Sequence, residues 1–226
     1  MRLTLLSTLA VGAAMFAASS GTALAAATYC SVAGSPNTAG MKLSDLTFSG
    51  NTPTTSADDC YGIVAGNESQ TSINGLNLTW GTNWTFLVKD ESESGSASTG
   101  SFGGISYSLN GFSASTSGNW TLNAGPADSL PVFVDFIAVL KGSNEHALWF
   151  FDDVKIDGSD DGTWQSVFTN NNGKLQDLSH ISLYIRNGRD PGDPPVVIDV
   201  PEPATLALVG LALFAAGAAR RRARSG

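Results

Sequence analysis

The sequence predicts an all-β fold, an antiparallel β-sandwich with a jelly-roll-like arrangement, for residues 28–186. Apolar and polar residues alternate in short segments bounded by Gly, Asn and Ser, a pattern typical of half-buried strands. No long amphipathic helix is apparent between residues 28 and 200. Residues 131–140 are nearly all apolar, as expected for a central strand buried on both faces. About nine to eleven short strands separated by polar turns favour a sandwich.

The expected strands follow one another along the chain with their apolar residues on one face. In order, these residues are Leu76, Leu78 and Trp80; Trp84, Phe86 and Val88; Phe102, Ile105 and Tyr107; Trp120 and Leu122; and Ile181, Leu183 and Ile185. Gly103-Gly104 interrupts the third group, where we expect a β-bulge. Residues 141–144 are expected to form a hairpin turn after the central strand.

Two segments fall outside this pattern. Residues 90–101 are acidic and rich in Ser and Gly, so we expect a mobile loop that buries nothing. Residues 187–200 carry three prolines and no core pattern, so we expect an extended Pro-rich linker.

The N-terminus, residues 1–27, has the pattern of a signal peptide. Arg2 provides a positive start, residues 3–18 are apolar or small, and Ala23-Leu24-Ala25 has the small-x-small pattern of a signal peptidase site. We therefore predict export, with cleavage after Ala25 or after Ala27.

The C-terminus, residues 201–226, has three parts in a fixed order. They are the Pro-Glu-Pro motif of Pro201, Glu202 and Pro203; an uncharged apolar run from Ala204 to Ala219; and the basic end, residues 220–226, with Arg220, Arg221, Arg222 and Arg224. As a helix the run is about 24 Å long. Snorkelling arginines and local thinning allow it to span a hydrocarbon core of about 30 Å. The arginines act as a basic membrane stop and place the C-terminus in the cytoplasm.

This ordered tail resembles the C-terminal sorting signal of PEP-CTERM proteins, which are exported by Gram-negative bacteria that produce exopolysaccharide. The resemblance implies that an exosortase-type sorting enzyme recognises and processes the tail. The protein would be anchored transiently in the inner membrane and then reach the cell surface or the extracellular space. The resemblance further implies a structural or adhesive role in extracellular matrix or biofilm, with exopolysaccharide as a partner.

The charge balance argues against nucleic acid as a partner. Five of the 12 basic residues lie in the two targeting segments, so residues 28–203 hold 7 basic and 20 acidic residues, a balance of −13. Phosphate binding needs clusters of Lys and Arg, and residues 28–203 contain none.

The two cysteines, Cys30 and Cys60, predict a disulfide, because an even count in an exported protein indicates a bridge. A metal pair or a reactive thiol is the rival interpretation, but no histidine lies nearby in the sequence.

Residues 157–162 offer a calcium site with incomplete ligands. Asp157, Ser159 and Asp161 stand at positions 1, 3 and 5 and Gly162 at position 6, as in an EF-hand loop. Phe168 stands where that loop needs a glutamate. A polar hairpin turn explains the same residues, so calcium at Asp157, Ser159 and Asp161 is the alternative, and no other cofactor is expected.

We expect no catalytic residues. His146 and His180 lack metal-ligand spacing, and we expect both to lie on the rim of the domain. A glycosidase needs only two carboxylates. The candidate acids are Asp135, Glu145, Asp152 and Asp153. Their spacing singles out no pair, so a glycan-active enzyme is disfavoured. The five tryptophans suggest a lectin-like module as an alternative, although most of them stand in register with core residues.

Overall fold

Antiparallel β-strands make up most of the chain that the computed structural model describes, namely residues 27–30, 37–50, 55–91, 97–111, 114–190 and 192. The strands are β1 (Thr28–Tyr29), β2 (Thr47–Phe48), β3 (Thr55–Ser56), β4 (Asp59–Ala65), β5 (Thr85–Asp90), β6 (Ser98–Phe102), β7 (Ile105–Asn110), β8 (Ser117–Gly125), β9 (Val132–Gly142), β10 (Glu145–Ile156), β11 (Ser159–Gln165) and β12 (His180–Asn187). One α-helix, α1 (Gln70–Gly75), and two 3₁₀ helices, η1 (Leu43–Asp45) and η2 (Ala127–Ser129), join them. The predicted all-β class is confirmed.

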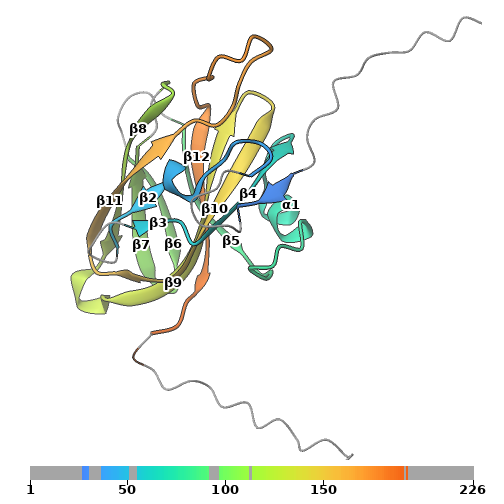
Figure 1. Ribbon diagram of the computed structural model, residues 1–226. Coiled ribbons are helices and arrows are strands. Elements are labelled where there is room, and N and C mark those ends of the chain that lie inside the picture. Colours follow the sequence, from blue (N-terminus) through green and yellow to red (C-terminus); the bar gives the residue numbers. More distant parts are fainter. Residues whose placement is uncertain are drawn as a thin grey trace, which may run out of the picture. The chain divides into compact units, whose positions relative to one another are not determined.

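The strands form two main sheets, which Figure 1 shows as separate layers. The six-stranded sheet has the order β1-β4-β10-β9-β12-β5, and the four-stranded sheet has the order β11-β8-β7-β6. Strands β2 and β3 form a small third sheet. All the pairings are antiparallel, and the expected jelly-roll arrangement stays a prediction.

The expected central strand is confirmed as β9, which pairs with β10 on one side and β12 on the other. The predicted hairpin after it is also present, because Gly142 pairs with Glu145 across Ser143-Asn144. Ser143 has φ of 47°, the left-handed conformation that such a tight turn requires.

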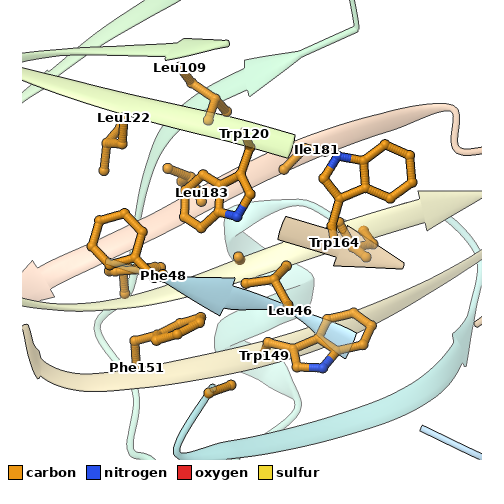
Figure 2. Packing of buried hydrophobic residues seen from close by; sticks show 14 of the residues in the cluster. Leu46, Phe48, Leu109, Trp120, Leu122, Trp149, Phe151, Trp164, Ile181 and Leu183 are labelled. Carbon is orange, nitrogen blue, oxygen red and sulfur yellow. The ribbon is translucent and has the colours of Figure 1, made fainter. Parts of the chain in front are cut away.

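The main core lies between the two large sheets. Figure 2 shows three tryptophans in it, Trp120, Trp149 and Trp164, packed among Leu and Phe side chains. Each indole N–H donates at 3.0 Å to a backbone carbonyl, those of Thr47, Lys42 and Gly111 respectively. The N–H groups are therefore satisfied inside the core, where an unpaired donor would be costly.

A second apolar cluster covers the other face of the six-stranded sheet. Residues 73–84, which include the end of α1, pack there against side chains of β9, β10 and β12. The members are Ile73, Leu78, Trp80, Trp84, Ile137, Val139, Leu148, Phe150 and Tyr184. Apolar burial on both faces explains why β9 has almost no polar residues.

The prediction of a strand from Leu76 to Trp80 is wrong. Helix α1 and two turns occupy this region, and Ser69 caps the helix by accepting a hydrogen bond from the Ser72 N–H at 3.1 Å. Asn77 has φ of 49°, which a strand does not permit. The alternating apolar residues instead belong to a connection that lies over the six-stranded sheet.

Three smaller expectations are also corrected. Gly103 and Gly104 form the two-residue turn of the β6–β7 hairpin, with φ of 59° and 84°, rather than a bulge. Asp90 and residues 98–101, expected in the acidic loop, lie in β5 and β6 respectively, and Asp90 is buried. Val88 packs in the core between the sheets while Trp84 lies on the opposite face, because the β5–β12 register shifts between them.

Two predicted segments lie outside the described residues, namely residues 1–26 of the signal peptide and the sorting tail, residues 201–226. Most of the predicted linker also lies outside them. Over the chain that is described, no helix is both long enough and apolar enough to cross a membrane.

Candidate functional site

Both histidines of the chain lie in one row across the six-stranded sheet. His146 of β10 and His180 of β12 each pair in register with Lys141, which lies on β9 between them. Only 2% of His146 and of Lys141 is exposed, so the expectation that His146 is a rim residue is wrong. Strand pairing, rather than sequence proximity, brings these groups together.

Glu68, which lies two residues before α1, binds the β12 end of this row. Its Oε1 pairs with His180 Nε2 and also accepts a hydrogen bond from Ser182 Oγ at 2.9 Å. The Glu68 side chain is 4% exposed. Burial alone would raise the pKa of this carboxyl, but the hydrogen bond and charge of His180, with the Ser182 hydroxyl, lower the pKa to about 2. Glu68 is therefore ionised at neutral pH.

The remaining members of the row are held by backbone carbonyls. His146 Nδ1 lies 3.1 Å from the Gly66 carbonyl oxygen, so Nδ1 is the ring nitrogen that donates to this carbonyl. Burial lowers the pKa of His146 and also that of Lys141, whose Nζ donates to the Ser143 carbonyl. His146 Nε2 and Glu68 Oε2 are buried without a hydrogen-bond partner among the described groups.

A polar hollow of about 530 Å³ opens beside this network, between residues 67–70 and strands β5 and β12. Phe86 forms one side of it and is 43% exposed, with its ring 5.6 Å from that of Tyr184 in an edge-on arrangement. Lys89 and Glu91 line the hollow as an ion pair at 2.8 Å. The hollow therefore combines one accessible aromatic ring with charged and hydrogen-bonding groups.

A second cluster of polar groups lies at the opposite end of the same sheet face. Carboxylate oxygens of Asp135, Asp152 and Asp153 lie within 4.8 Å of one another, an arrangement that could hold a metal ion. Asp135 already binds Arg186 through Nε and Nη2, each at 2.7 Å. Burial, Asp135 and Asp153 raise the pKa of Asp152 to about 6. These acids were sequence candidates, but the β10 bulge that gathers them was not predictable from their spacing.

The structure places the candidate calcium residues in a crossover between sheets. Strand β10 pairs with β4 and β9, whereas β11 pairs with β8, so the hairpin turn expected here is wrong. Asp157 lies in the connection and binds Lys155 at 3.0 Å. Ser159 and Asp161 lie on β11 and face solvent. Calcium binding by Asp157, Ser159 and Asp161 stays a prediction.

Asp160, between the two candidate ligands of β11, points the other way. It is 4% exposed, and its Oδ2 has no hydrogen-bond partner among the described groups. Burial, together with Asp157 and Asp161, raises its pKa to about 6.

The predicted disulfide between Cys30 and Cys60 is present, with a Cα–Cα distance of 5.0 Å. Both residues are buried, and the Cys30 N–H donates to the Cys60 carbonyl at 2.8 Å. The bridge joins the first described segment to β4.

Residues 199–222 match the PEP-CTERM protein-sorting motif, which confirms the resemblance seen in the tail. Neither a curated protein nor a solved structure matches the chain. The motif implies an exported protein that is anchored transiently through its C-terminal part and processed by an exosortase-type enzyme.

Proposed function

We propose that this exported, sorted protein is a non-enzymatic structural or adhesive component of the bacterial surface or extracellular matrix, associated with exopolysaccharide and biofilm. The sorting motif at residues 199–222 is the observation that carries the proposal. Residues 204–219 would form the temporary membrane helix, and the Pro-rich linker would hold the β-domain away from the bilayer.

The polar groups of the hollow support a binding role for the hollow rather than a catalytic one. Ser182 donates its hydrogen bond to Glu68, so it is not activated by a histidine base as a nucleophile would be. A glycosidase needs a carboxylic acid that stays protonated near neutral pH. In the hollow, the pKa of Glu68 is about 2, and the Lys89 ion pair lowers the pKa of Glu91. Both carboxylates are therefore suited to binding rather than to proton donation.

A lectin-like module is the second candidate, and Phe86 is the observation that favours it. The tryptophans of the domain are buried, with Trp80 the most exposed at 8%, so they offer no stacking surface. Phe86 is 43% exposed beside polar groups. An adhesive role and a glycan-binding role are compatible, since holding polysaccharide is one way to join a matrix.

The proposal is tested by following the protein in a host that carries the sorting enzyme. The parent should be shortened, released from the inner membrane and recovered with the extracellular polysaccharide fraction. Replacing Pro201, Glu202 and Pro203 with alanine should leave insertion intact, because the apolar run and the arginines are unchanged. The variant should accumulate at full length in the inner membrane, since prolines hold the motif extended for recognition.

Two outcomes count against the proposal. If parent and variant are shortened and released at the same rate, the motif is only a linker. If the released parent stays wholly in the soluble fraction and none is recovered with matrix polysaccharide, the matrix role is wrong even though sorting occurs.

A further inference from the structure

The exposed ring of Phe86 is unusual for this domain. Phe86 and Leu175 are the large apolar residues described as exposed, each at 43%. Phe86 lies on β5, an edge strand, where its N–H donates to Gln70 Oε1 at 3.0 Å and its ring meets Tyr184 edge-on. Backbone and ring are therefore both held in place. An exposed aromatic ring that lines a hollow is suited to stack on a flat apolar surface of a ligand.

The rest of the hollow requires that this ligand also carry many hydrogen-bonding groups. Gln70, Lys89, Glu91 and Ser182 line it, whereas pockets for apolar ligands are lined mostly by hydrophobic side chains. Its volume of about 530 Å³ lies within the usual range for small-molecule sites. A sugar ring combines an apolar face of C–H groups with a rim of hydroxyls, which is the combination that this hollow requires.

Charge further narrows the class of sugar. Two carboxylates, Glu68 and Glu91, line the hollow. Lys89 is already paired with Glu91 at 2.8 Å, and His180 with Glu68. An anionic sugar would have to compete with these carboxylates for the same cations, and its entry adds like-charge repulsion. A neutral ring meets no such cost, and an ammonium group gains attraction.

We propose that this hollow binds a neutral or amino sugar ring stacked on Phe86, and that it discriminates against uronate rings. The proposal rests on the matrix function proposed above, which brings the domain into contact with polysaccharide. It goes further by assigning the site, the residue that stacks and the class of sugar.

Direct binding tests the inference. The full chain, purified in a detergent without a sugar headgroup, is titrated with trimers of glucose, of glucosamine and of glucuronate, followed by calorimetry and saturation-transfer NMR. The glucose or the glucosamine trimer should bind with a Kd of about 1 mM or tighter, and the glucuronate trimer at least about tenfold more weakly. Phe86→Ala should weaken the binding by about tenfold or more, because the stacking face is lost.

Two further variants separate the site from general effects. Leu175→Ala removes an equally exposed apolar side chain and should leave the affinities unchanged. Glu91→Gln removes the ion-pair partner of Lys89. This variant should therefore show a smaller difference in affinity between the glucuronate trimer and the other two trimers. Thermal unfolding should show that Phe86→Ala remains folded, since its side chain is on the surface.

The inference is overturned if none of the three trimers binds, if Phe86→Ala binds as tightly as the parent, or if glucuronate binds best. Such a result would leave sorting and recovery with the matrix untouched. Conversely, normal sugar binding by a protein that never joins the matrix would remove the proposed function and retain the site.

Discussion

Replacing Glu68 with glutamine should destabilise the domain in a manner that depends on pH. Glutamine keeps the shape of the side chain and can still accept the Ser182 hydroxyl, but it removes the charge that His180 faces. The pKa of Glu68 falls from 4.5 in its ordinary state to about 2 in the folded domain. The folded pKa is thus the lower one, so this stabilisation is fully present above about pH 4.5 and is lost as pH falls towards 2.

The size of the effect follows from the same difference in pKa. Each pKa unit corresponds to about 1.4 kcal/mol, which would give roughly 3 kcal/mol without screening. The hollow beside Glu68 is open to solvent, so we expect about 2 kcal/mol. For a domain of this size that corresponds to a fall in Tm of about 4–8 °C.

Thermal unfolding of the parent and of Glu68→Gln between pH 6 and pH 2.5 measures this difference. Glu91→Gln is the matched control, because Glu91 lines the same hollow but makes a surface ion pair worth about 0–1 kcal/mol. The Tm gap between the parent and Glu68→Gln should be largest near pH 6 and should close towards pH 2.5. A gap that is constant over this range, or no larger than that of the control, refutes the reasoning.

Three other results are expected. Alkylation of unreduced, denatured protein should label neither Cys30 nor Cys60, and labelling of most of the sample would contradict the bridge. Replacing both cysteines with alanine should lower the unfolding free energy by roughly 3–4 kcal/mol, because the bridge closes a loop in the unfolded chain. Millimolar calcium should raise the Tm of the parent but not that of the Asp157→Ala/Asp161→Ala variant, by mass action on the folded state; an unchanged Tm in the parent, or an equal rise in the variant, counts against the site. In chelator at pH 7, Asp160→Asn should raise the stability by roughly 1–2 kcal/mol. The folded pKa of about 6 lies above the ordinary value of 3.8, so the carboxyl becomes progressively more destabilising as pH rises from about 4 to about 6, and the effect is constant above that. The gain should vanish in unfolding curves below about pH 4, and a gain that persists there would point to a cause other than charge.

Local patterns in the sequence were sufficient to predict three features of the protein. Apolar burial on both faces leaves a continuous apolar run, so β9 was found within two residues of its ends. Two cysteines permit one pairing, so Cys30 and Cys60 could be assigned. The Pro-Glu-Pro tail is a linear motif, read without any knowledge of the fold.

The candidate site could not be found in this way, because it is made by strand register and by a distant segment. Glu68 and His180 are 112 residues apart, and the six-residue helix that follows Glu68 is too short to show a helical period. The strand order does indicate that the two histidines lie at the same end of the sheet. Strands β10 and β12 both pair antiparallel with β9, so they run in the same direction and their first residues lie at one end of the sheet. His146 and His180 both stand near those starts.

The position of β12 determines when the domain can fold during export. This strand is the last of the domain in the sequence, yet it lies inside the six-stranded sheet, between β9 and β5. A chain that crosses the membrane from its N-terminus brings out all the other strands first, and until β12 follows, β9 and β5 keep unpaired edges. The core also lacks Ile181, Leu183 and Ile185 until then. The native sheet can therefore close only after residue 187 has crossed, when the linker and then the sorting motif reach the membrane.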